Sequence, residues 1–165
     1  MRKLLLIFCF FCAMLSFCKL NPNLQGSGEN YLQGVWNEDS ILYQSALLQY
    51  TSHKFKFTCD SFYVTFHTTA KTNIFPDSCY NNGSWLEFAK GIYAVKSDTV
   101  YLSGTFTKPN FKQKISGCYR IGQYTETFVV NKKSLGFLEL KSLKQHLPVT
   151  LKLKEKITCI PQPIN

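Results

Sequence analysis

A two-residue alternation of apolar and polar side chains recurs along most of this chain and constrains its fold more than any other feature. In residues 54–59, phenylalanine and cysteine share one face while lysine and threonine occupy the other. Residues 62–67 repeat the pattern, and residues 149–158 show it with valine, leucine and isoleucine. Successive side chains of a strand point to opposite faces, so the pattern predicts β-strands that bury one face.

Short polar turn sequences separate these segments, as at Asp60-Ser61, 96–98 and 131–134. Eight or nine short strands joined in this way describe an antiparallel meander. A sheet with one apolar face has to curl over that face to keep it dry. We therefore predict an all-β fold, an antiparallel meander closed into a barrel of about eight strands.

One segment has the pattern of a helix. Asp39-Ser40 provides a capping sequence, and apolar side chains at helical spacing follow over Ile41–Tyr50. We therefore expect one short helix near residues 40–50. Residues 71–84, rich in Asn, Pro, Asp and Gly, are expected to form a long loop.

The N-terminus has the features of an export signal. Arg2-Lys3 precedes an apolar run over residues 4–17, and the run ends at Cys18. About 14 residues of helix span roughly 21 Å, which is too short for a bilayer core of about 30 Å. We assign residues 1–17 to a signal peptide, 18–30 to a flexible tether and 31–165 to one barrel domain.

The end of the apolar run resembles a bacterial lipobox, in which the cysteine is acylated, for example with palmitate, and becomes the first mature residue. The resemblance makes Cys18 the lipidation site. Phe17 departs from the pattern, because a small residue usually precedes that cysteine. An ordinary secretory signal, cleaved near Ala13 or Cys18 without lipidation, and a retained anchor remain the alternatives.

The charge balance argues against a nucleic-acid partner. The formal net charge of +9 falls to +7 when Arg2 and Lys3 leave with the signal. The lysines are spread singly along the strands, and Arg120 is the one arginine beyond the signal. Arginine is the side chain that most often contacts bases and phosphates, so we expect no nucleic acid.

Four cysteines remain beyond Cys18, an even number in an exported domain: Cys59, Cys79, Cys118 and Cys159. They are disulfide candidates, and three connectivities are possible. We favour Cys59–Cys79 with Cys118–Cys159, because each pair flanks one half of the chain. No two of them have metal-ligand spacing, and no metal or cofactor is expected.

Gly34-Val35-Trp36 opens the first expected strand and resembles the Gly-x-Trp signature of the lipocalins and related barrels. The resemblance implies a lipocalin-like barrel in which Trp36 plugs the closed end. It also implies an arginine over the tryptophan ring, a part that only Arg120 could play. Trp85 follows a loop and is expected to contribute much less to stability.

Residues 31–36, 57–64 and 117–120 also resemble segments of small lipobox-bearing bacterial proteins, some of which carry a fumarate hydratase label. The chain lacks the Gly-Ser-Ser-x-Met-Pro loop of one fumarase class and the cluster spacing of the other. An acidic substrate would also require more than one arginine. We do not adopt that activity.

No catalytic residue can be assigned. The chain has no Gly-x-Ser-x-Gly elbow, and His53, His67 and His146 stand apart without a nameable partner. Aromatic side chains are abundant, which suits either core filling or a barrel mouth that takes an apolar ligand.

The leading hypothesis is a monomeric, lipid-anchored protein of the bacterial cell envelope, on the periplasmic face of the outer membrane, that binds a small hydrophobic ligand or an envelope partner. An envelope enzyme and a structural or inhibitory module are the alternatives. A cavity above roughly 300 Å³ would favour ligand binding, whereas a histidine clustered with carboxylates at the mouth would favour an enzyme.

Substitution of Cys18 tests the lipid anchor. Cys18→Ser removes the thiol that would carry the acyl chains, so the protein should move to the soluble fraction or accumulate unprocessed. Detergent partitioning of membranes with mass measurement of the N-terminal peptide checks this. Unchanged partitioning would contradict lipidation at Cys18.

Overall fold

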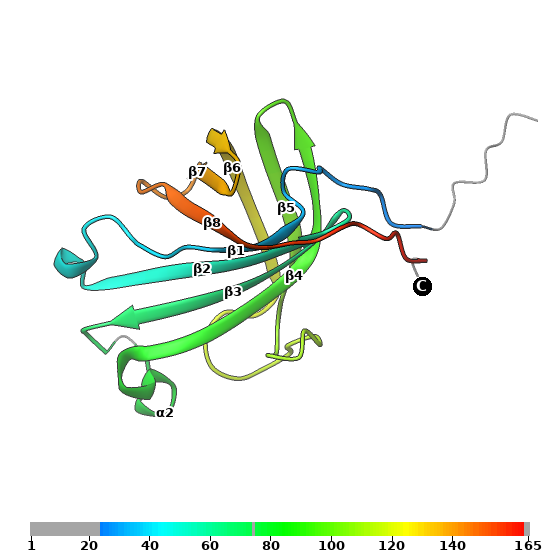
Figure 1. Ribbon diagram of the computed structural model, residues 1–165. Helices are drawn as coiled ribbons and strands as arrows, with labels where there is room; N and C mark the ends of the chain where they lie inside the picture. The colour runs from blue at the N-terminus through cyan, green and yellow to red at the C-terminus, as the bar shows by residue number, and fades with distance from the viewer. Residues whose placement is uncertain (1–23, 74, 164–165) are drawn as a thin grey trace, which may run out of the picture.

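The computed structural model describes residues 24–73 and 75–163, and these form an eight-stranded antiparallel barrel (Figure 1). Each strand pairs with its neighbour in sequence, and β1 pairs with β8 to close the ring. The strands are β1 (Gly34–Asn37), β2 (Gln49–Thr58), β3 (Ser61–Ala70), β4 (Ser84–Lys96), β5 (Thr99–Thr107), β6 (Gln123–Ser134), β7 (Phe137–Ser142) and β8 (Val149–Lys156). The predicted all-β fold, a closed antiparallel meander, is confirmed.

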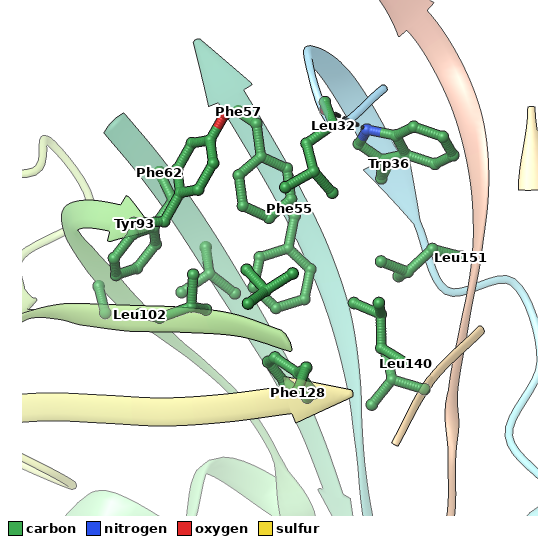
Figure 2. Close-up of a cluster of buried hydrophobic side chains, with 14 of the residues drawn as sticks. Leu32, Trp36, Phe55, Phe57, Phe62, Tyr93, Leu102, Phe128, Leu140 and Leu151 are labelled. Atoms are coloured by element: carbon green, nitrogen blue, oxygen red, sulfur yellow. Dashed lines mark hydrogen bonds between the residues drawn. The ribbon is translucent and has the colours of Figure 1, made fainter. Parts of the chain in front are cut away.

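The predicted alternation sorts the side chains between the interior and the surface. In β3, Phe62, Val64 and Phe66 are buried, while Tyr63 and Thr65 between them are half-buried. Similar faces of all eight strands converge on one core, in which phenylalanine rings stack and meet edge to face (Figure 2). Burial of each such ring stabilises the fold by about 1.5–3 kcal/mol.

The two ends of the barrel differ. Tight turns join β2 to β3, β4 to β5 and β6 to β7 at one end, which we call the closed end. Four longer connections lie at the other end, the mouth: residues 38–48, 71–83, 108–122 and 143–148. Figure 1 shows both termini of the described chain beside the closed end, away from η1 (Gln44–Ala46) and α2 (Asp77–Tyr80).

Residues 24–30, expected within a flexible tether, instead pack across the closed end. The Glu29 amide donates to the Tyr93 hydroxyl at 2.9 Å. The buried Gln33 amide donates to the Cys59 carbonyl at 2.8 Å and accepts from the Cys59 N–H at 2.7 Å. Gly28 has φ 63°, and a Cβ there would lie 1.8 Å from the Cys59 carbonyl oxygen. Ordered structure therefore begins earlier than Tyr31, where we predicted it.

The four cysteines are paired, but the connectivity we favoured is wrong. The disulfides are Cys59–Cys159 and Cys79–Cys118. Cys59 lies at the closed end, and the ten residues of β3 carry the chain to the mouth before Cys79. A strand of that length spans about 33 Å, whereas disulfide-bonded Cα atoms lie about 5–6 Å apart. Each bridge therefore joins segments that share one end of the barrel.

The helix expected over Ile41–Tyr50 is only a 3-10 turn, η1. Gln49 and Tyr50 pair with Ala70 and Thr69 in the β2–β3 ladder, so the sheet takes the end of the segment. Asp39, the expected cap, instead accepts a hydrogen bond from Lys154 at 2.7 Å. In the expected loop, a four-residue helix, α2, and a 3-10 turn, η2 (Asn81–Gly83), form between β3 and β4.

Trp36 is buried toward the closed end, as the lipocalin signature implied, and its indole N–H donates to the Leu32 carbonyl at 2.7 Å (Figure 2). A Cβ on Gly34 would lie 2.5 Å from the Glu155 carbonyl oxygen, so glycine permits the close approach of β1 to β8. No cation lies over the Trp36 ring among the described residues. The prediction that Arg120 lies over the Trp36 ring is therefore wrong. Arg120 instead lies over Phe66 and Phe106, toward the mouth.

Trp36→Ala should lower the free energy of unfolding by about 3–5 kcal/mol, because the side chain is 2% exposed and fills the space between β1, β8 and Leu32. Leu135→Ala, in an exposed turn, is the control and should change stability by less than about 0.5 kcal/mol. Urea denaturation followed by circular dichroism measures both. Equal stability of the two variants would contradict the plug role of Trp36.

Candidate functional site

The interior of the barrel becomes polar toward the mouth. The apolar layers of the core give way there to buried side chains that carry hydrogen-bonding groups: His53, Thr68, Glu87, Glu126 and Ser142. Buried polar groups need partners, because an unpaired one costs about 1–3 kcal/mol. The contacts of these side chains therefore decide which polar groups at the mouth are already paired and which are available to a ligand.

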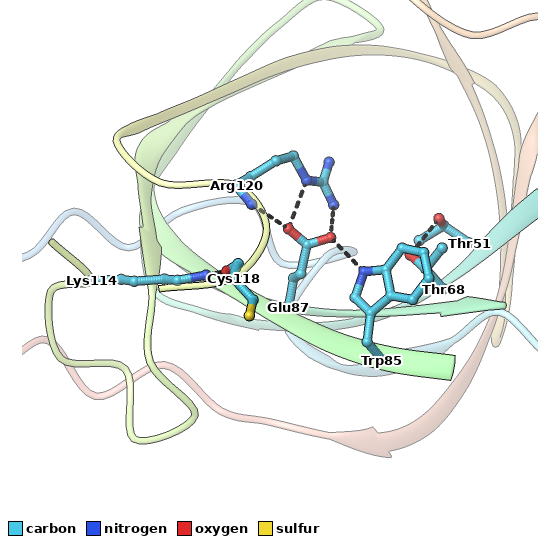
Figure 3. Close-up of polar contacts among 7 residues, drawn as sticks. All are labelled: Thr51, Thr68, Trp85, Glu87, Lys114, Cys118 and Arg120. Carbon is cyan, nitrogen blue, oxygen red and sulfur yellow. Dashed lines mark hydrogen bonds and ion pairs between the residues drawn. The ribbon is translucent and has the colours of Figure 1, made fainter. Parts of the chain in front are cut away.

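Arg120 forms a two-pronged ion pair with the buried carboxylate of Glu87. Its Nε and Nη2 atoms donate to the two carboxylate oxygens at 2.9 Å each, and its backbone N–H adds a bond of 3.0 Å (Figure 3). The indole N–H of Trp85 donates to the same carboxylate at 3.3 Å. Burial raises the pKa of Glu87, but the hydrogen bonds and charge of Arg120 outweigh it and hold the pKa below its ordinary 4.5.

The Arg120 guanidinium lies 4.8 Å from the ring centres of both Phe66 and Phe106. These contacts explain why Arg120 does not reach Trp36: its segment belongs to the mouth connection 108–122, and Glu87 holds it there. Tyr119-Arg120-Ile121 is part of this connection and forms no strand.

Two mouth connections are fastened to each other beside this ion pair. The Cys79–Cys118 disulfide joins them, and the Tyr119 hydroxyl donates to the Cys79 carbonyl. Tyr119 stacks on Trp85 with ring centres 5.2 Å apart, and Phe75 meets both rings edge-on. Trp85 is only 4% exposed, so it is buried although it follows a loop, and its smaller contribution to stability stays a prediction.

A cavity of about 600 Å³ opens between the connections 38–48 and 143–148. Its apolar wall comes from Ile41, Leu47, Tyr50, Leu147, Pro148 and Val149. Its polar members include Glu38, Gln49, Thr51, His53, Gln145 and His146. A second cavity of about 440 Å³ shares Gln49 and Thr51 with it and reaches Glu87 and Arg120.

His53 and Glu38 form a buried pair on the wall of the larger cavity. The imidazole Nδ1 lies 2.7 Å from Glu38 Oε2, and the His53 backbone N–H donates to the same oxygen at 3.1 Å. The two side chains are only 6% and 4% exposed. The imidazole ring stacks on Phe55 and meets Phe66 edge-on, which fixes its orientation.

This pair was not predicted from the sequence, although the alternation in β2 indicates the inward position of His53. Continuing the alternation of Phe57 and Phe55 back along β2 places His53 on the inward face. Glu38 directly follows β1, and its N–H donates to the His53 carbonyl at 2.9 Å. Of the other histidines, His67 is exposed and bonded to Ser84, and His146 lines the cavity.

The remaining predicted site residues are divided between the two ends. Gly34, Trp36, Cys59 and Cys159 lie toward the closed end, while Cys79, Cys118 and Arg120 lie at the mouth. Cys18 is outside the described residues. Within the described ranges, no cluster of three or more histidine, cysteine, aspartate or glutamate side chains could hold a metal ion. The same ranges contain no helix long and apolar enough to cross a membrane.

Comparisons with known proteins add no relative to this description. No protein-family model matches the chain. No match was found among curated proteins or among solved structures.

The Glu87–Arg120 ion pair should make stability depend on pH. Because the folded-state pKa of Glu87 is lowered, the stabilisation is present above pH 4.5 and is lost as the pH falls through the folded-state value. Glu87→Gln should therefore reduce the free energy of unfolding at pH 7 by about 1–2 kcal/mol, a figure discounted for the half-exposed guanidinium.

The difference between wild type and Glu87→Gln should shrink in urea titrations at pH 5, 4 and 3. Glu155→Gln, at an exposed position of β8, serves as the control and should match wild type at pH 7. A difference that stays constant down to pH 3 would contradict a stabilising, ionised Glu87.

Proposed function

We propose that this protein is a lipid-anchored lipoprotein of the bacterial cell envelope whose barrel binds a small hydrophobic ligand at its mouth. The observation that carries the proposal is the cavity of about 600 Å³ between the connections 38–48 and 143–148. Cavities that hold small molecules usually measure about 300–1,000 Å³.

The composition of the wall supports an apolar ligand with a polar group. Isoleucine, leucine, proline and valine side chains cover part of the wall, and the His53–Glu38 pair is among its polar groups. Additional apolar side chains stand exposed on the connections at the mouth, Leu42, Leu48 and Leu143, and Tyr43 of the cavity wall is exposed as well. An apolar ligand or partner that covers them would remove this surface from water.

The position of the N-terminus supports an orientation for the anchored protein. Leu24 pairs with Pro163 beside the closed end, and it follows Cys18 by six positions. Six residues reach about 20 Å at most. A lipid on Cys18 would therefore hold the closed end near the membrane and direct the mouth away from it, toward the periplasm in our proposal.

A monomer is the simplest form of such a protein. Each strand of the closed ring pairs with two neighbours, so none of the eight is an edge strand. An unpaired edge is a common route by which β-proteins associate, so this barrel does not need a second copy to complete its sheet.

An enzyme is the second candidate, favoured by the buried His53–Glu38 pair on the cavity wall. A histidine oriented by a carboxylate is the usual form of a general base. However, the described residues that line this cavity include no serine or cysteine nucleophile. They also include no arginine or lysine. A dicarboxylate such as fumarate would therefore find no cationic lysine or arginine partner there and would be repelled by the carboxylate of Glu38. Binding remains our preferred function.

Two adjacent leucines allow a matched test of the cavity. Leu47 lines it, whereas Leu48 is 70% exposed and does not. Leu47→Asp and Leu48→Asp carry the same charge change. Binding of N-phenyl-1-naphthylamine, an uncharged apolar dye that fluoresces in apolar surroundings, should weaken at least tenfold in Leu47→Asp and stay within twofold of wild type in Leu48→Asp.

Thermal melts of both variants establish that they fold before the dye is added. Dye fluorescence that stays at the level of free dye with wild-type protein would count against the proposed function. Equal loss in the two variants would place the dye on the exposed rim and not in the cavity.

A further inference from the structure

Two polar atoms on the cavity wall have no partner within the described chain. Glu38 Oε2 accepts both N–H groups of His53. Glu38 Oε1 and His53 Nε2 make no hydrogen bond to any described residue, and neither atom is sealed inside the protein. Both side chains line the cavity and are at least nine-tenths buried. Their free atoms are therefore available to a molecule in the cavity.

Both of these atoms are hydrogen-bond acceptors. An ionised carboxylate oxygen has no proton to donate. In a neutral imidazole only one nitrogen carries a proton, and the contact of Nδ1 with Glu38 places the proton there. Nε2 then presents a lone pair. These two acceptor atoms on the cavity wall therefore complement a ligand group that donates hydrogen bonds.

The charge of the wall excludes acidic head groups. No lysine or arginine is among the described residues that line the cavity. Arg120, in the adjacent cavity, is already engaged by Glu87. A carboxylate or phosphate group beside Glu38 would bring two negative charges together in a partly desolvated site, where their repulsion is poorly screened.

Resting on the proposed function, we propose that the mouth cavity selects amphiphiles whose polar head donates hydrogen bonds, as a hydroxyl or ammonium group does. The head donates to Glu38 Oε1 and His53 Nε2, and the apolar body lies against Ile41, Leu47 and Leu147. Carboxylate heads are rejected.

The net charge of the whole chain, +9, would on its own favour the opposite selectivity. That field is screened over about 8–10 Å at physiological ionic strength, whereas Glu38 would contact the head group directly. Selectivity for donors over anions therefore separates the effect of this site from the effect of the overall charge.

The test compares three ligands that share one chain, 1-octanol, octylammonium and octanoate, by ¹H–¹⁵N NMR titration at pH 8. An imidazole is ordinarily neutral at this pH. Octanol and octylammonium should each bind at least tenfold more tightly than octanoate, with the largest shifts at the amides of Glu38 and His53. The ratio between the first two tells which donor is preferred.

Glu38→Gln removes the charge and keeps the shape of the side chain. It should weaken octylammonium at least fivefold and narrow its advantage over octanoate, while Glu155→Gln, on the exposed face of β8, should leave all three affinities unchanged. If Glu38→Gln does not fold, the three-ligand comparison with wild type still decides the question.

Octanoate that binds as tightly as octanol and octylammonium would overturn the selectivity but leave ligand binding at the mouth intact. If all three affinities are unchanged in Glu38→Gln, the role of Glu38 in the selectivity is overturned, and ligand binding at the mouth again stays intact. If no ligand shifts the amides of the mouth, both the selectivity and the proposed function are overturned.

Discussion

The pairing of β1 with β8 is the contact on which the rest of the structure depends. β1 is four residues long, yet it completes the ring by bonding to β2 on one side and β8 on the other. Gly34 permits this approach because any side chain there would collide with the β8 backbone. Closure turns one face of a meander into an interior, and it brings both ends of the described chain to the closed end, where the Cys59–Cys159 disulfide ties the C-terminal segment to the β2–β3 turn.

Closure also creates the chemical contrast between the two ends. At the closed end, the space is filled by Leu32, Trp36 and Gln33, and their polar groups have partners. The Trp36 indole bonds to the Leu32 carbonyl, and the buried Gln33 amide bonds to the Cys59 backbone. At the mouth, carboxylates enter the barrel and each needs a partner. Glu87 acquires one from the connection 108–122, whereas among the described residues Glu38 acquires only His53 and keeps one oxygen free. This difference is why the cavity beside Glu38, and not the ion pair of Arg120, carries the functional proposal.

Much of the fold could be predicted, but little of the site. The alternation around Phe55 and Phe62 predicted strands and their buried faces, because that pattern depends on local backbone geometry alone. The helix predicted over residues 41–50 did not form, because its last residues joined the β2–β3 ladder. The His53–Glu38 pair was missed because it depends on the register of β1 against β2, and no local pattern reports a register.

By itself, the amino-acid sequence determined the class of fold and the inward faces of the strands, since both follow from side-chain periodicity and the need to keep apolar surface dry. The burial of Trp36 was what the resemblance of Gly34-Val35-Trp36 to the lipocalin signature implied. Only the tertiary structure decided which cysteines pair, which carboxylate holds Arg120 and where the cavity lies. These features join residues that are far apart in the sequence, for example Cys59 and Cys159 at a separation of 100 positions. Their contacts depend on strand order, closure and the end of the barrel at which each connection lies, and those are properties of the assembled sheet.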